Sequence, residues 1–179
     1  EVFRERGPRW TLGWADRLLA KGFLTSWTRL DGIPLIIVNT HMLANYDEDW
    51  APDNRFAREQ QKDLTQLADA INRLDREAVV IVAGDFNVPP SSPIMSEFVS
   101  ACDLRDAFDS ASGPAPLTLR PTGPRQVGYV LDHILYRHPP GLDVRVAASL
   151  RFEEPLTLAS GRSAYASDHL AVEAAFDID

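Results

Sequence analysis

The fold is decided by the stretch Ala78-Val79-Val80-Ile81-Val82-Ala83-Gly84-Asp85-Phe86-Asn87, an apolar run that stops at a glycine and continues with a carboxylate and an amide. Six small or β-branched residues, too few for a helix and polar on neither face, predict a buried strand of an α/β sheet. Such sheets bind ligands at the carboxyl ends of their strands, where Asp85 and Asn87 stand. Gly84 lets the backbone leave the strand, and residues two apart in extended chain point the same way, so the two polar side chains are expected to converge.

The same motif has a second explanation. Asp and Asn side chains satisfy backbone N–H groups in ordinary turns, and Gly-Asp-x-Asn taken alone favours a turn. Three further polar clusters in the chain, each beside an apolar strand, favour a functional site instead.

A hairpin precedes the stretch. Residues 23–29 and 33–39 have strand patterns, and Asp31-Gly32 between them supplies the turn. The second strand is apolar on both faces and ends in Asn39-Thr40-His41, so a histidine stands at the exit of a buried strand.

A long helix is expected between the two buried strands, opening at Pro52-Asp53 and ending near Arg76. Its apolar positions recur at steps of three and four residues: Phe56, Gln60, Leu64, Leu67, Ile71 and Leu74. Strand, helix and strand form a crossover unit, which places both strand exits at one edge of one sheet. We therefore expect His41 near Asp85 and Asn87.

The remaining elements are shorter. Ser92 and Pro93 are expected to cap and start a helix that ends near Ala101. Residues 109–128 are expected to form either a specificity loop or a mobile connection. Residues 1–20 are expected to be irregular or marginally helical. Further strands are expected over 129–136, 142–150 and 170–178, with an irregular loop over 153–166.

Two of these strands carry polar residues in unusual places. Asp132 lies between Val130 and Ile134 on one face of its strand, and an ionisable carboxylate in such surroundings requires a partner. Ser167-Asp168-His169 comes directly before the last strand. His133 and His138 are interpreted as structural.

Composition limits the classes of function. The 179 residues, 45% hydrophobic and 25% charged, suffice for a single domain with a sizeable core. The net charge of −8 opposes non-specific binding to duplex DNA. Lys21 and Lys62 are the only lysines, and the arginines are scattered, so the chain has no strong nucleic-acid footprint.

Cys102 is the only cysteine, so no internal disulfide forms and no zinc site is indicated. The chain has no apolar run long enough to span a membrane and no signal peptide at its start. It opens with Glu1-Val2 rather than methionine, which is typical of a processed product or a partial sequence, and localisation stays open.

The order and spacing of the four polar clusters resemble the endonuclease/exonuclease/phosphatase superfamily of metal-dependent phosphoesterases. The resemblance runs from about Lys21 to Ile178. The matching motifs are Lys-Gly before a strand, Asn-Thr-His, Gly-Asp-Phe-Asn, Leu-Asp-His-Ile and Ser-Asp-His. The superfamily includes apurinic endonucleases, deoxyribonuclease I-like enzymes, inositol polyphosphate phosphatases and neutral sphingomyelinases.

This resemblance implies a four-layered α/β sandwich of two packed sheets. Members of the family begin with strands that bear an Asn and a magnesium-binding Glu, and no such region precedes Glu1. Residues 1–179 are therefore expected to form one domain that is the C-terminal portion of the family fold. Its uncovered sheet face is expected to lead to self-association or to be covered by an N-terminal segment of a longer chain.

The resemblance also implies roles for individual residues. His169 is implied to be the general base that activates water, with Asp132 orienting it. His41 stabilises charge on the phosphoryl oxygens, Asp85 aligns water or assists the leaving group, and Asn87 holds the phosphate and Asp85. Asp168 is the implied Mg²⁺ ligand, with Asp85 and Asn87 as further candidates and Mn²⁺ as the alternative ion.

The leading hypothesis is therefore an Mg²⁺-dependent phosphoester hydrolase. Net acidity and scarce lysine favour a small or lipid phosphate ester over DNA, with a DNA endonuclease or exonuclease as the alternative. A further alternative is a non-catalytic fragment or binding module that keeps the fold.

Overall fold

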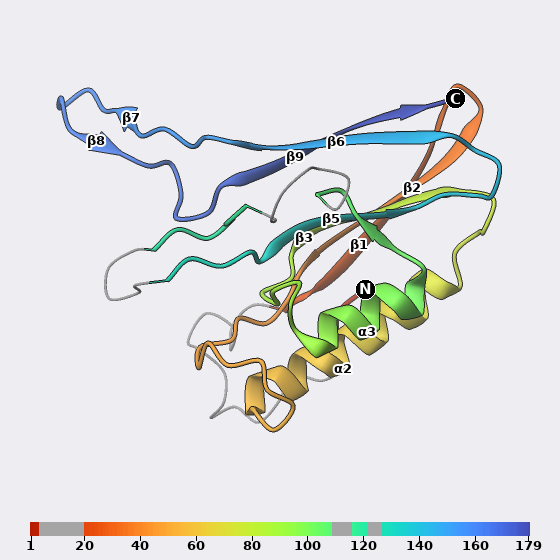
Figure 1. Ribbon diagram of the computed structural model, residues 1–179, viewed down its shortest axis with the longest axis horizontal. Coiled ribbons are helices and arrows are strands. Elements are labelled where there is room, and N and C mark those ends of the chain that lie inside the picture. The colour runs from red at the N-terminus through yellow and green to blue at the C-terminus, as the bar shows by residue number, and fades with distance from the viewer. Residues whose placement is uncertain (4–19, 109–115, 122–126) are drawn as a thin grey trace.

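The computed structural model describes residues 1–3, 20–108, 116–121 and 127–179. Figure 1 shows three layers: two helices below, a five-stranded sheet in the middle and a two-stranded sheet above. The α/β sandwich with two packed sheets that the sequence predicts is confirmed, and the described residues form three of its four expected layers. The expectations for residues 1–20 and 109–128 lie largely outside the described residues.

The first two strands form the predicted hairpin. β1 (Gly22–Leu30) pairs antiparallel with β2 (Ile33–His41). Asp31 and Gly32 join them with φ values of 49° and 87°, and two positive φ values in succession give the turn whose twist matches that of the strands. β2 ends at His41, as predicted.

The crossover unit is also confirmed. α2 (Arg55–Asn72) leads to β3 (Val79–Asp85), which lies parallel to β2 with His41 beside Asp85. The helix begins later than predicted because Asn54 rather than Pro52-Asp53 caps it, and it ends earlier, at Asn72. The Asn54 side chain accepts hydrogen bonds from the backbone of Phe56 and Ala57 at 2.8 and 3.2 Å.

The sheet is completed by β5 (Asp132–Arg137), antiparallel to β3, and by β4 (Arg105–Asp106) at its edge, in the order β1-β2-β3-β5-β4. α3 (Pro93–Cys102) precedes β4. Ser92 occupies the N-cap of α3, but its hydroxyl makes no capping bond, so the predicted side-chain cap is wrong and Pro93 begins the helix by its fixed φ alone.

The second sheet pairs β6 (Val144–Arg151) with β9 (Ala171–Ile178), antiparallel. Between them, β7 (Leu156–Thr157) and β8 (Ser163–Ala164) form a small hairpin where an irregular loop was expected, and it projects from the body in Figure 1. β9 contacts β5 through an edge-on pair of rings, Tyr136 and Phe176, whose centroids lie 5.5 Å apart.

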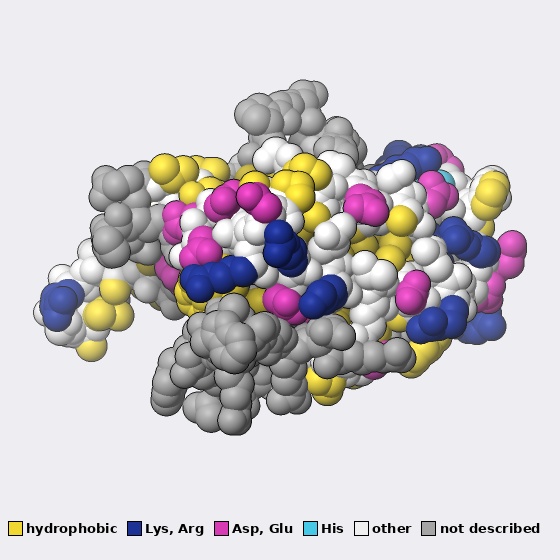
Figure 2. All heavy atoms as spheres, turned by 90° about the horizontal axis from the view of Figure 1, so that it is seen from below, with side chains coloured by type: hydrophobic (Ala, Val, Ile, Leu, Met, Phe, Trp, Pro, Cys, Tyr) yellow, Lys and Arg dark blue, Asp and Glu magenta, His cyan; other side chains and the backbone are white. Residues whose placement is uncertain are grey.

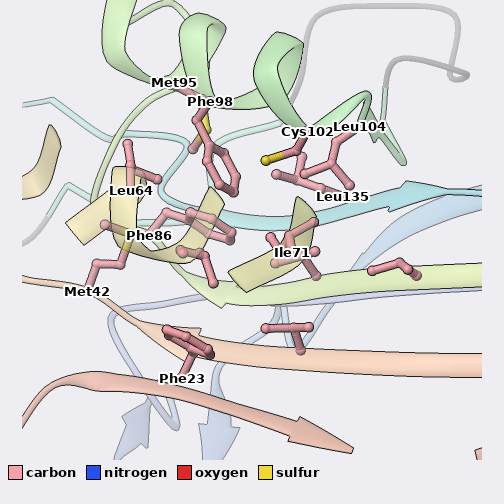
Figure 3. Packing of buried hydrophobic residues seen from close by; sticks show 14 of the residues in the cluster. Phe23, Met42, Leu64, Ile71, Phe86, Met95, Phe98, Cys102, Leu104 and Leu135 are labelled. Atoms are coloured by element: carbon pink, nitrogen blue, oxygen red, sulfur yellow. The ribbon is translucent and has the colours of Figure 1, made fainter. Parts of the chain in front are cut away.

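The helices cover one face of the five-stranded sheet and bury the main core there. Figure 3 shows helix and loop side chains packed on strand side chains such as Phe23 and Leu135. Alternate residues of β2 and β3 contribute to it: Ile36, Val38, Val80 and Val82. Among the described residues, no helix is long and apolar enough to cross a membrane.

The opposite face of the same sheet is covered only in part. Along β2 the buried Ile36 and Val38 alternate with Ile37, which is 38% exposed. Leu24 of β1 lies on the same open face and is 67% exposed. β2 is therefore apolar on both faces, as the sequence indicates, but fully buried on only one, because the second sheet contacts the first through β9 and β5.

Candidate active site

Three polar side chains stand in one row at the edge of the sheet. β2 ends at His41, β3 ends at Asp85 and β5 begins at Asp132, and the strand register makes these residues lateral neighbours. All three side chains lie on the face of the sheet that the helices do not cover, because side chains alternate along each strand and neighbours such as Thr40 and His133 are buried on the helix side. The crossover places β2 beside β3, and the antiparallel pairing of β5 with β3 adds Asp132, which lies 91 positions after His41 in the sequence (132 minus 41).

Gly84 makes this row possible. A Cβ at this position would lie 1.9 Å from the carbonyl oxygen of Thr40, and its φ of +146° is one that residues with side chains rarely adopt. Glycine therefore lets β3 lie beside β2 as far as Asp85, whereas the sequence predicted that Gly84 lets the backbone leave the strand.

A fourth side chain reaches the row from the segment before β9. His169 Nδ1 lies 2.8 Å from Asp132 Oδ2, and the two side chains are 30% and 20% exposed. The Ser167 hydroxyl accepts a hydrogen bond of 3.0 Å from the backbone N–H of His169. The hydrogen bond to Asp132 raises the pKa of His169, and the negative charges of Asp132, Asp85 and Asp168 raise it further against the opposing effect of burial.

Asp85 lies in the centre of the row, with its Oδ2 3.5 Å from His41 Nε2. Burial raises the pKa of Asp85, and the nearby charge of Asp132 raises it further. The backbone N–H of Asn87 opposes this through a hydrogen bond of 2.9 Å to Asp85 Oδ1. Two carboxyl groups thus stand close together beside two imidazoles.

Asn87 takes a different conformation from the one expected. Its φ of 52° is left-handed, so the chain does not continue extended past Asp85, and the link between the two residues is the Asn87 backbone N–H. The side-chain amide donates to the carbonyl oxygen of Met42 at 3.0 Å. The carbonyl oxygen of Asn87 accepts hydrogen bonds from the side chains of Trp50 and Gln60, at 3.0 and 2.8 Å. These two hydrogen bonds hold the backbone of Asn87 in place.

One group of side chains in the described part of the chain could hold a metal ion. Ligand atoms of Asp85, Asp132 and His169 all lie within 4.8 Å of one another. Asp168 is not in this group, although its charge reaches His169. Carboxylate oxygens are the donors that Mg²⁺ and Mn²⁺ prefer.

Several residues that shape the site were not predicted from the sequence. Trp50 and Gln60 support Asn87, and Thr118 hydrogen-bonds the backbone of Asp132 at 3.0 Å. Gln60 fits the apolar helix pattern and gave no other signal. Thr118 comes from the part of the chain where the sequence has no periodicity, and nothing local distinguishes it from other loop threonines.

Comparisons with known proteins agree with this geometry. A sequence model described as Endonuclease/Exonuclease/phosphatase family matches residues 4–169. No curated protein matches the chain in a sequence search.

Solved structures share the fold at low sequence identity. Truncated TDP2 of Caenorhabditis elegans has a TM-score of 0.67 and 17% identity, with 88% of this chain and 60% of that chain covered. A Staphylococcus aureus beta toxin mutant with bound magnesium ions has 0.59 and 18%, covering 87% and 57%. Sphingomyelinase C from Streptomyces griseocarneus has 0.56 and 24%, covering 89% and 59%. The chain thus spans less than two thirds of these proteins.

Proposed function

Because the chain belongs to the endonuclease/exonuclease/phosphatase family, we propose that it is a metal-dependent hydrolase of phosphoester bonds that works at this edge of the sheet. The observation that carries the proposal is the 2.8 Å hydrogen bond between His169 and Asp132, with Asp85 beside them. A phosphoester is negatively charged and repels hydroxide, so its hydrolysis needs a positive charge on the phosphoryl oxygens and a base for water.

His169 is the proposed general base. When its Nδ1–H donates to Asp132, the lone pair on Nε2 is left to take a proton from water. The raised pKa of His169 makes the imidazole a stronger base, and the Asp132 carboxylate stabilises the imidazolium that forms. Asp132 therefore acts by orienting His169 and by charge.

Asp85 and Asn87, with Asp168, are the proposed metal ligands. All three offer oxygen donors, which a hard divalent cation such as Mg²⁺ or Mn²⁺ prefers. Burial and the charge of Asp132 both raise the pKa of Asp85, so a bound cation would favour the ionised carboxylate. Such an ion supplies charge stabilisation for the phosphoryl oxygens. His41 is proposed to bind those phosphoryl oxygens. Asp85 is proposed to align water or assist the leaving group.

We further propose that the described site is one part of a larger one. The support for this is the open face of β1 and β2, which exposes the large apolar side chains of Leu24 and Ile37 on the same face of the sheet as His41. A covering segment on that face would bury this surface and add a carboxylate ligand, as a Glu does in the family. Self-association through the face is the rival, and sedimentation of the 179-residue chain at several concentrations separates the two.

A small or lipid phosphate ester is the proposed substrate class. The net charge of −8 disfavours duplex DNA, and on the face shown in Figure 2 basic and acidic side chains are intermingled rather than gathered in a basic stripe. The similarity in fold to a sphingomyelinase C is consistent with a lipid substrate. A DNA endonuclease or exonuclease and a non-catalytic binding module are the alternatives.

Salt dependence distinguishes these substrates. We expect the full-length protein to hydrolyse choline phospholipids or a small phosphodiester at rates that change little with added NaCl. Preferred cleavage of duplex DNA, with binding that weakens steeply as salt rises, would show a nuclease. Binding of phosphate esters with no turnover of any substrate, in a folded protein with Mg²⁺, would show a binding module.

A further inference from the structure

Thr118 lies between the two segments that carry the His169–Asp132 pair, and no part of it is exposed. Its hydroxyl oxygen accepts two hydrogen bonds, from the backbone N–H of Leu131 at 2.8 Å and of Asp132 at 3.0 Å. A hydroxyl has two lone pairs, so both are used on the first residues of β5. The Asp132 backbone is therefore fixed from the side of Thr118.

The backbone of Thr118 fixes the other member of the pair. Its carbonyl oxygen accepts from the N–H of Leu170 at 2.7 Å, directly after His169, and its own N–H donates to Tyr129 at 2.9 Å. The next two residues continue this pattern, since Leu119 bridges both Tyr129 and His169 and the Arg120 N–H donates to the Asp168 carbonyl at 2.9 Å. Residues 118–120 thus run between the segment before β5 and the segment before β9.

We propose that Thr118 is a positioning residue, whose hydroxyl and carbonyl hold the backbones of Asp132 and His169 at the separation that their 2.8 Å hydrogen bond requires. For its effect on catalysis the inference rests on the proposed function, while its effect on the pair does not. Displacing a catalytic group by about 1 Å can cost roughly a hundredfold in rate. Because Thr118 is fully buried, it would act through Asp132 and His169 and not by contacting substrate.

Two substitutions isolate the hydroxyl. Thr118→Val keeps the shape of the side chain but removes the oxygen that accepts from the N–H groups of Leu131 and Asp132. Thr118→Ser keeps the hydroxyl and loses only a methyl group. A difference between Val and Ser therefore reports the hydrogen bonds rather than packing.

The direct measurement is long-range ¹H–¹⁵N NMR of the histidine rings at alkaline pH, which reports the nitrogen that carries the hydrogen in each neutral imidazole. His169 should hold its hydrogen on Nδ1 in the wild type and in Thr118→Ser. In Thr118→Val it should shift toward the Nε2–H form. His133, which bonds Asp106 and the Val88 carbonyl on the other face of the sheet, serves as the internal control and should not change.

Activity provides the second measurement. With Mg²⁺ and a small phosphodiester, kcat of Thr118→Val should fall about 10- to 100-fold while KM stays within about twofold, and Thr118→Ser should restore most of the rate. If no variant and no wild-type protein turns over substrate, the proposed function fails and the NMR result still decides the role of Thr118.

An unchanged His169 ring in Thr118→Val would overturn the inference, and so would a shifted ring that Thr118→Ser fails to restore. If the tautomer of His133 also changes in Thr118→Val, the fold has been disturbed generally. The smaller variant Thr118→Ala, which also lacks the hydroxyl, then replaces Thr118→Val in the experiment. The same selective shift of His169 is expected there, and its absence contradicts the proposal.

Discussion

Two Asp–His pairs lie on opposite faces of β5, and they differ in nearly every respect except residue type. Asp132 points to the open face and bonds His169, with side chains 20% and 30% exposed. His133, the next residue, points to the helix face and bonds Asp106 at 3.1 Å, with side chains 1% and 14% exposed. The second His133 nitrogen lies 3.0 Å from the carbonyl oxygen of Val88, which follows the Asn87 loop.

The difference shows that burial, rather than residue type, separates the structural pair from the pair at the candidate site. The ring of His133 is enclosed by the core and stands perpendicular to that of Phe86, with the ring centroids 5.5 Å apart, so no substrate can reach it. The side chain of His169 is bound to Asp132 through one nitrogen, is 30% exposed and lies near Asp85 at the edge of the sheet. Because side chains alternate along a strand, β5 contributes Asp132 to the proposed catalytic pair and the next residue, His133, to the structural pair.

The largest effect should come from the exposed pair. His169→Ala in the full-length protein should lower turnover of a phosphodiester roughly a hundred- to ten-thousand-fold, because a general base is lost, and leave the unfolding transition almost unchanged. Steady-state kinetics and urea denaturation measure the two quantities. Near-normal turnover in His169→Ala together with complete loss in Asp85→Ala would transfer the role of base to Asp85.

The buried pair should respond in the opposite way. His133→Ala leaves Asp106 and the Val88 carbonyl without their partner and opens a cavity, which should lower the free energy of unfolding by about 2–4 kcal/mol. His169→Ala, as the matched control, should lower it by less than about 1 kcal/mol. Equal losses in both variants would show that the two faces of β5 are equivalent.

Two neighbouring isoleucines of β2 test the same contrast without polar groups. Ile36→Ala on the covered face should cost about 2–4 kcal/mol, whereas Ile37→Ala on the open face should cost less than about 1 kcal/mol in the 179-residue chain. In the full-length protein Ile37→Ala should cost more, because the proposed covering segment packs there. An Ile37→Ala cost that is the same in both chain lengths would argue against such a segment.

The smallest effect is a dependence of stability on pH. The hydrogen bond to Asp132 raises the pKa of His169 in the folded protein, so the folded state holds this proton more tightly than the unfolded state does. The stabilisation is fully present below the unfolded-state pKa of about 6.5 and is lost as pH rises through the folded-state value. The difference in unfolding free energy between wild type and His169→Gln should therefore shrink, by under about 1 kcal/mol, between about pH 6 and pH 9 without metal. A difference that grows with pH would contradict the assigned contact.

Sequence patterns predicted most of the fold because hydrophobic periodicity records which faces are covered. The hairpin turn at Asp31-Gly32, the crossover and the alternation of β6 and β9 all follow from local pattern. Helix ends were less accurate, since Asn54 and Pro52-Asp53 are equally good caps until the Asn54 side chain is seen to bind Phe56 and Ala57. The β7–β8 hairpin has strands of two residues, too short for any periodicity.

The residues of the site could be found in the sequence, but the residues that support them could not. His41, Asp85, Asp132 and His169 each stand beside an apolar strand, and the order of their motifs matches a family. Thr118 binds distant backbone N–H groups through its hydroxyl and its carbonyl oxygen, and Trp50 donates its indole N–H to a distant backbone carbonyl. Such contacts depend on tertiary arrangement and leave no local pattern.

The central claim is that the open edge of the sheet is a metal-dependent phosphoesterase site. Its most direct test is the rate at which the full-length protein hydrolyses bis(p-nitrophenyl) phosphate before chelation of divalent ions, after chelation, and after Mg²⁺ or Mn²⁺ is restored. We predict that chelation abolishes turnover and that either ion restores it. Turnover that persists after complete chelation, or no turnover with either ion in a protein that unfolds cooperatively, would contradict the claim.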